Sequence, residues 1–249
     1  MATEQPYEYQ DGDVTCKGVL VLPDGDDKRP GVVVFPDIAG VSTHSLGRAH
    51  RLADELGYVS LVADVYGNGE VPGLPDAHGV VASWISRPGD LATRSVAAIE
   101  ALEAHPRCDG RIGAIGFCFG GAAVLSVVRS GRSNLRAGAT FHAVLGTPEG
   151  AIADKAKASL LVCHGADDPF AGDAPLLGMV ENIKATTLAE FLREMADASV
   201  DCQVIAYAGQ VHSFTIPDAD KFGTPGARYD KRTDDRSWKA LVSFLDETL

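Results

Sequence analysis

The segment with the clearest chemical potential is Gly116-Phe117-Cys118-Phe119-Gly120, which has the pattern G-x-C-x-G. It is the nucleophile-elbow pattern G-x-S-x-G with cysteine in the serine position, and it lies where an elbow must lie, between a strand pattern and a helix pattern. The N–H groups and dipole at a helix N-terminus favour thiolate over thiol. The sequence therefore predicts a nucleophilic Cys118. The alternative is a structural cysteine in a Gly-rich turn, since free cysteines are commonly buried.

An acid and a base follow the elbow in the chain order nucleophile, acid, histidine. Asp167 and Asp168 come directly after an apolar run, and carboxylates at the carboxyl end of a parallel strand face the ligand crevice. His212 follows the next strand pattern, after Gly209. Spacing alone does not choose between the two aspartates. Either one completes a candidate triad with His212.

These residue types together indicate nucleophilic catalysis on a carbonyl carbon. Cys118 attacks, His212 carries the proton, and the aspartate orients the imidazole and stabilises its charged form. The oxyanion that forms needs two hydrogen-bond donors. We expect them to be the backbone N–H of Phe119 and an N–H near Ile38, in the loop after the first buried strand.

Short apolar runs alternate with helical patterns, which is typical of an α/β protein with a mostly parallel sheet covered by helices on both faces. The expected strands are Val14–Leu22, Gly31–Phe35, Ser60–Asp64, Arg111–Gly116, Ala137–Phe141, Ser159–His164 and Cys202–Tyr207. The expected helices are Ser45–Leu56, Leu91–Ala104, Phe119–Arg129, Thr187–Ala198 and Arg232–Thr248. Two Gly/Pro-rich loops, Gly67–Pro75 and Asp218–Arg228, are long enough to shape a pocket mouth.

Composition narrows the functional classes. The chain has 249 residues and a formal charge of −12, which disfavours nucleic acid and anionic membranes as partners. No apolar run reaches the ~18 residues of a membrane span. The five cysteines form no C-x-x-C pair, and no secretory signal is visible. We expect a reduced cytoplasmic protein with one domain over residues 1–249.

Four segments together resemble the dienelactone hydrolase family, within the α/β-hydrolase fold: Phe35–Gly40, the elbow, Gly165–Pro169 and His212–Phe214. The similarity extends from about Val14 to Leu249. It implies hydrolysis of the enol-lactone dienelactone to maleylacetate without a metal or organic cofactor. It also implies that Asp168 is the acid, because Pro169 follows it. The family usually has a Glu that contacts the resting cysteine, and the corresponding residue here is Asp37.

The chain departs from the family pattern where members bind the lactone carboxylate with two arginines. One lies in the segment corresponding to Val65–Ser86, which contains no Lys or Arg here. The other lies four residues after the catalytic histidine, where this chain has Ile216. Arg87 and Arg228 are the nearest arginines, but neither matches by position. We therefore expect a neutral or aryl ester, or another lactone, as the small-molecule substrate.

Other functions stay open. The same cysteine could serve a thioesterase or acyl-transfer enzyme, and a catalytically silent binder of this fold is a further alternative. A redox sensor is disfavoured because no resolving cysteine lies close in sequence. The protein is expected to be a monomer or a homodimer. Candidate pocket residues, each of which could equally be core packing, are Tyr66, Trp84, His142 and Phe214.

Overall fold

The computed structural model describes residues 1–147, 156–170 and 186–249. Its described strands form one sheet of eight, in the order β1-β2-β4-β3-β5-β6-β7-β8. The strands are β1 Thr3–Asp11, β2 Val14–Leu22, β3 Arg29–Phe35, β4 Val59–Val62, β5 Cys108–Phe117, β6 Ala137–Phe141, β7 Ser159–Gly165 and β8 Cys202–Tyr207. The helices are α1 Thr43–Leu56, α2 Leu74–Ile85, α3 Pro88–Glu103, α4 Phe119–Ser130, α5 Leu188–Asp197 and α6 Lys231–Thr248, with a short 3-10 helix at Ala219–Phe222.

The sheet is parallel from β4 through β8, whereas β1 and β2 pair antiparallel at one edge. Val32, Val33 and Val34 in β3 are fully buried, as expected for a strand that is covered on both faces. Every strand expected from the sequence is present with small shifts of its ends. The predicted α/β architecture with a mostly parallel sheet is confirmed.

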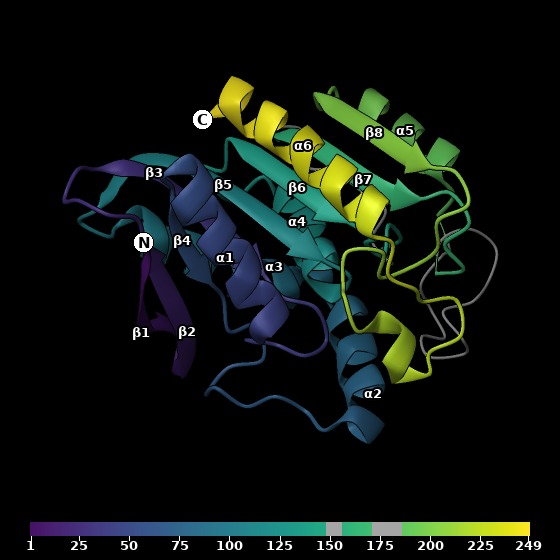
Figure 1. The fold of residues 1–249 in the computed structure, drawn as a ribbon, viewed down its shortest axis with the longest axis horizontal. Helices are drawn as coiled ribbons and strands as arrows, with labels where there is room; N and C mark the ends of the chain where they lie inside the picture. The colour runs from purple at the N-terminus through teal and green to yellow at the C-terminus, as the bar shows by residue number, and fades with distance from the viewer. Residues whose placement is uncertain (148–155, 171–185) are drawn as a thin grey trace.

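Helices cover both faces of the sheet (Figure 1). On one face, α1 and α6 pack on a cluster that includes Leu52, Phe117 and Trp238. On the other face, α3, α4 and α5 pack on a second cluster that includes Leu102 and Phe191. Because the parallel strands end at the same edge, the loops after β3, β5, β7 and β8 converge there.

Two elements differ from the expectation. Strand β1 is not predicted from the sequence, because its side chains are mostly exposed and polar. Its antiparallel pairing with β2 holds it in the sheet. Helix α2 was not predicted either: its N-cap is Gly73, with no side-chain cap hydrogen bond, and the helix contains Gly79. Its first residues lie in the stretch Gly67–Pro75, which had been expected to be loop throughout. The glycines and prolines of this stretch favour a loop, but the helix that follows them is stabilised by packing on α3 and α4.

Candidate active site

Cys118 occupies a strained turn between β5 and α4. Its backbone has φ 52° and ψ −113°, which is unusual for a residue other than glycine. Such a conformation costs about 1–3 kcal/mol and persists where the surrounding structure enforces it. Cys118 is also the N-cap of α4, at the positive end of the helix dipole, and its side chain makes no capping hydrogen bond. The structure has the sharp strand-to-helix turn that the G-x-C-x-G pattern predicts.

The flanking glycines are required by close backbone contacts. A Cβ on Gly116 would collide with the backbone of Gly120. A Cβ on Gly120 would collide in turn with the carbonyl groups of Phe35 and Pro36 at the end of β3. The spacing of these glycines therefore lets α4 begin immediately against the neighbouring strand, with Cys118 held at the tip of the turn.

Asp168 and His212 lie together at the ends of β7 and β8. The Nδ1 atom of His212 is 2.9 Å from Oδ2 of Asp168, and both side chains are buried. The other oxygen of Asp168 accepts a hydrogen bond from the backbone N–H of Phe170 at 2.9 Å. Asp167, by contrast, is exposed. Of the two aspartates that the sequence left open, the structure brings Asp168 to the histidine.

The loop that carries His212 is fixed by backbone hydrogen bonds. The N–H of His212 donates to the carbonyl of Gly226, and its carbonyl accepts from the N–H of Arg228, both at 3.0 Å. A Cβ on Gly226 would run into the ring of Pro169, so the segment carrying Gly226 packs against the acid loop. These contacts fix the backbone of His212 next to the acid loop, and the hydrogen bond to Asp168 orients its imidazole.

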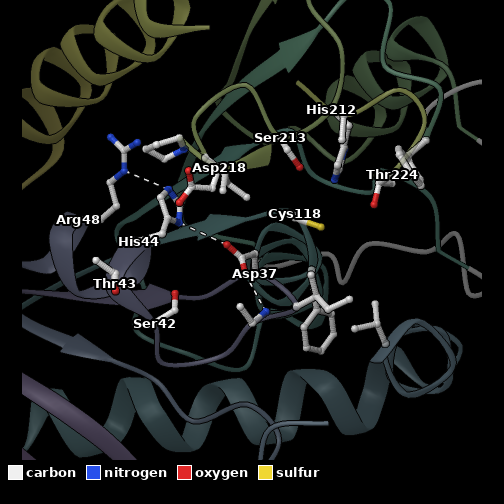
Figure 2. A pocket seen from close by; sticks show the side chains of 18 of the residues that line it. Asp37, Ser42, Thr43, His44, Arg48, Cys118, His212, Ser213, Asp218 and Thr224 are labelled. Carbon is white, nitrogen blue, oxygen red and sulfur yellow. Dashed lines mark hydrogen bonds and ion pairs between the residues drawn. The ribbon is translucent and has the colours of Figure 1, made fainter. Parts of the chain in front are cut away.

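Electrostatics favour a charged imidazole next to the sulfur. Burial alone disfavours the imidazolium, but the charges of Asp168 and Cys118, and hydrogen bonds to both, raise the pKa of His212 well above its usual value. Burial likewise opposes ionisation of Asp168, yet His212 and the other hydrogen bonds lower the pKa of that carboxyl. The ring of His212 points toward the sulfur of Cys118 (Figure 2). The imidazole of His212 therefore lies between the sulfur of Cys118 and the carboxylate of Asp168.

His142 supports this histidine from behind. Its ring meets the His212 ring edge-on with 5.1 Å between centroids, and its Nε2 lies 2.8 Å from Oγ1 of Thr215. Burial, followed by the charge of His212, lowers the pKa of His142 well below its usual value. Phe214 packs edge-on against the same ring at 5.2 Å. A neutral His142 thus fills the space behind the charged His212.

A cavity of about 880 Å³ opens at Cys118 (Figure 2). Its wall includes Ile38 and Phe119, the expected sources of the oxyanion donors. Within the described residues, no hydrogen bond occupies the N–H of either one. Further apolar side chains in the wall are Val81, Ala82, Val144, Phe170, Ile216 and Pro217.

The four candidate pocket residues require a correction, because none of them belongs to the wall of this cavity. His142 and Phe214 are completely buried behind His212. Trp84 packs under Arg87 and Arg94 on the α2–α3 side. Tyr66 lies behind Ile38 and Phe119. His142 and Phe214 are therefore core residues, whereas Tyr66 and Trp84 are partly buried and pack against the core.

The sequence also missed a polar chain along the cavity wall. Arg48 donates from Nε to Nε2 of His44 at 3.3 Å, and Nδ1 of the same ring lies 3.4 Å from Oδ2 of Asp37. At the far end, Arg48 pairs with Asp234 at 2.8 Å and donates to the carbonyl of Thr215 at 2.7 Å. His44 and Arg48 are one turn apart on α1, and this i, i+4 spacing just after the oxyanion loop was the available signal.

Asp37 uses both carboxylate oxygens within this arrangement. Oδ1 accepts from the N–H of Ala39 at 2.7 Å, and Oδ2 faces His44. No hydrogen bond joins Asp37 to Cys118 in the part of the chain that the structure describes. The expected contact of this carboxylate with the resting cysteine stays a prediction.

Among the described residues of the wall, no arginine has a free guanidinium. Arg48 is bound to Asp234, and Arg51 pairs with Glu55 at 2.7 Å while stacking on Trp238. Arg87 and Arg228, the nearest arginines by sequence, do not belong to the wall. Arg87 pairs with Asp90, and Arg228 donates to the carbonyl of Gly209. The wall does contain two further carboxylates, Asp37 and Asp218.

The described residues show neither a metal cluster nor a membrane-spanning helix. They contain no group of three or more His, Cys, Asp or Glu side chains arranged to hold a metal ion. Among their helices, none has the length and apolar character needed to cross a bilayer.

A family model and a solved structure point to the same family. The model of the dienelactone hydrolase family matches residues 16–249. The structure of a dienelactone hydrolase-like promiscuous phosphotriesterase from metagenomic libraries superposes with a TM-score of 0.89 at 37% identity, covering 99% of this chain and 98% of that one.

Two curated relatives are more distant. An uncharacterised protein of Caenorhabditis elegans is 32% identical over 162 residues, which are 65% of this chain and 96% of the relative. A Bradyrhizobium protein named "Probable 2-oxo-3-(5-oxofuran-2-ylidene)propanoate lactonase" is 27% identical over 207 residues, 78% of this chain and 77% of the relative.

Proposed function

The chain belongs to the dienelactone hydrolase family and is an ester- or lactone-cleaving hydrolase of the α/β-hydrolase fold, and from this premise we propose a mechanism and a substrate class. The protein hydrolyses uncharged carboxylic esters or lactones through Cys118, His212 and Asp168. The observation that carries the proposal is the buried 2.9 Å contact of His212 with Asp168 beside a cysteine at the tip of a strained elbow.

The reaction proceeds in two steps. The thiolate of Cys118 attacks the carbonyl carbon, and the oxyanion is held by the N–H groups of Ile38 and Phe119. As the oxyanion collapses, the C–O bond breaks, the alkoxide takes the proton of His212 and a thioester remains on Cys118. His212 then takes a proton from water, the hydroxide attacks the thioester, and the acid and the thiolate are released.

The preference for an uncharged substrate follows from the charges of the cavity. Among the described wall residues both arginines are bound to carboxylates, Asp37 adds negative charge, and Asp218 is paired with Lys221. A carboxylate without a cationic partner is costly to bury, and removing one member of a buried pair typically costs about 2–5 kcal/mol. An anionic lactone should therefore bind tens- to thousands-fold more weakly than an uncharged ester of similar size, at about tenfold per 1.4 kcal/mol.

The test combines substrate specificity with acyl-enzyme trapping. The values of kcat/KM are compared for a nitrophenyl ester, its thioester, dienelactone and an uncharged diethyl nitrophenyl phosphate, since one relative is described as a phosphotriesterase. Clear preference for dienelactone would contradict the assignment of an uncharged substrate. Thioester preference would favour the acyl-transfer alternative, and no turnover of any of the four would favour a silent binder.

The nucleophile is tested by Cys118→Ala, with Cys202→Ala as control. Both cysteines are partly exposed, but burial and then the charge of Asp201 raise the pKa of Cys202 to about 12. We expect Cys118→Ala to stay folded and to lose turnover by orders of magnitude, together with the burst of nitrophenol and the acyl mass on the protein. Cys202→Ala should keep all three. Near-normal turnover in a folded Cys118→Ala variant would refute the mechanism.

A further inference from the structure

Tyr66 contacts both residues that supply the proposed oxyanion donors. It follows β4, and its hydroxyl donates to the carbonyl of Ile38 at 2.9 Å. Its ring stacks on the ring of Phe119, with 5.7 Å between centroids and 25° between planes. Tyr66 thus connects Ile38 and Phe119 from behind the cavity wall. It does not line the cavity, so it need not contact a substrate.

The hydroxyl fixes one peptide unit of the oxyanion loop. The carbonyl of Ile38 accepts from Tyr66, and the N–H of Ala39, in the same peptide unit, donates to Oδ1 of Asp37 at 2.7 Å. Both polar groups of that unit are therefore bound, which restricts rotation at Ile38. The N–H of Ile38 belongs to the preceding unit and stays available to the cavity.

The ring acts on the second donor. Phe119 is 1% exposed and begins α4, so its backbone N–H has no partner within the helix. Stacking against Tyr66 fixes the Phe119 side chain between the loop after β4 and the start of α4. Burial, and then the negative charges of Cys118 and Asp37, raise the pKa of the Tyr66 phenol, so it stays an O–H donor at neutral pH.

We propose that Tyr66 is a positioning residue that holds the N–H groups of Ile38 and Phe119 at the spacing an oxyanion requires. The inference rests on the proposed function, because it assigns the support of that site. Oxyanion stabilisation depends on donors placed before the charge develops. Loss of the support should therefore weaken binding of the tetrahedral oxyanion while leaving binding of the ground-state substrate nearly unchanged.

The test is Tyr66→Phe, which keeps the stacked ring and removes only the hydroxyl. We expect kcat to fall roughly 5- to 50-fold with little change in KM, less than the ~10²–10³-fold typical of deleting a donor outright. The second readout uses a trifluoromethyl ketone. The Cys118 thiolate adds to its carbonyl carbon and the C=O electron pair moves to oxygen, so the adduct carries an oxyanion and nothing leaves.

The affinity of this ketone is compared with that of the corresponding trifluoromethyl alcohol, which binds without an oxyanion. In Tyr66→Phe the ketone should weaken by the same factor as kcat/KM, and the alcohol should not. All constants are normalised to active sites by the nitrophenol burst, so partial misfolding does not affect them. Equal weakening of ketone and alcohol, or weakening of neither, would overturn the inference.

The matched control is Tyr7→Phe. The Tyr7 hydroxyl also donates to a backbone carbonyl, that of Ala101 at 3.0 Å, and its ring meets His105 edge-on, away from the cavity. It should reproduce any general loss of stability and leave the ketone-to-alcohol ratio unchanged. If the unmodified protein forms no adduct at Cys118, the proposed function fails. If it forms one and Tyr66→Phe keeps the full ratio, only the role of Tyr66 fails.

Discussion

Replacing Asp168 with asparagine tests the link between fold and chemistry most directly. The substitution changes one oxygen to an amide nitrogen and barely alters the volume. In the native protein Asp168 accepts a hydrogen bond from Nδ1 of His212 at 2.9 Å, and Asp168 is only 5% exposed. An amide at this position carries no charge and can present its NH₂ group to the imidazole, which favours the wrong tautomer.

The expected magnitude follows from these contacts. The imidazolium loses its carboxylate in a buried site where solvent screening is weak. In a comparable Ser-His-Asp triad the same change lowers kcat by ~10⁴. A cysteine thiolate is intrinsically a stronger nucleophile than a serine hydroxyl, which must be activated by a base, so the cysteine depends less on a correctly oriented histidine. We therefore expect kcat to fall about 10²- to 10⁴-fold here, which corresponds to about 3–5 kcal/mol of barrier.

The sign of the pH effect is also fixed by the structure. Burial opposes the charged imidazole and Asp168 favours it, so the pKa of His212 must fall in Asp168→Asn. His212 keeps its proton to a higher pH in the native protein and should lose it at a lower pH in the variant. NMR titration of the imidazole measures this shift, and burst kinetics with a nitrophenyl ester measure the acylation rate.

Asp167→Asn is the matched control, because its side chain is exposed and one residue away. Surface substitutions usually change stability by less than ~0.5 kcal/mol, and we expect turnover within about twofold of the native value. A larger loss in Asp167→Asn than in Asp168→Asn would reverse the assignment of the acid. Full activity in both variants would mean that His212 is not oriented by either carboxylate.

Two further predictions concern stability, measured by urea unfolding. Gly120→Ala should destabilise the protein by about 1–3 kcal/mol, because its Cβ meets backbone at the end of β3, whereas Gly79→Ala in α2 meets nothing and should be neutral or stabilising. Asp234→Asn should cost about 3–5 kcal/mol, because it leaves the Arg48 guanidinium buried without its carboxylate. Asp235→Asn, which breaks only an exposed pair with Lys231, should have little effect, and similar losses in both aspartate variants would contradict the argument.

The parts of the site that the sequence predicted are those with a local backbone signature. Cys118 is marked by glycines whose missing side chains are required by contacts within a few residues or with the next strand. The order of Asp168 and His212 follows from the parallel sheet, since successive strand ends lie at one edge. The choice of Asp168 over Asp167 needed the burial and the hydrogen bond that only the folded chain displays.

The parts that the sequence did not predict depend on contacts between distant segments. Arg48 and Asp234 are 186 positions apart in the sequence, and no local sequence pattern near either residue predicts that they pair. Tyr66 is an aromatic residue near the site, and the sequence could not tell whether it faced the cavity or its supporting wall. Its partner Ile38 is 28 positions away, and its contact is to a backbone carbonyl that carries no residue-type signal.

The distinction between local backbone signatures and long-range contacts also separates the features that serve catalysis from those that select a substrate. The elbow and the residues of the proposed triad are positioned by backbone geometry at the edge of the sheet, and the family match extends over these elements. The charged side chains of the cavity wall come mainly from α1 and from the segment around Asp218. On α1, the side chains of His44, Arg48 and Arg51 each contact a neighbouring carboxylate. In the part of the wall that the structure describes, both arginines are bound to carboxylates, so the proposed oxyanion depends on backbone N–H groups and neither arginine is free to attract a substrate carboxylate. We therefore expect the chain to keep the hydrolytic chemistry of the family and to act on the uncharged substrate class proposed above.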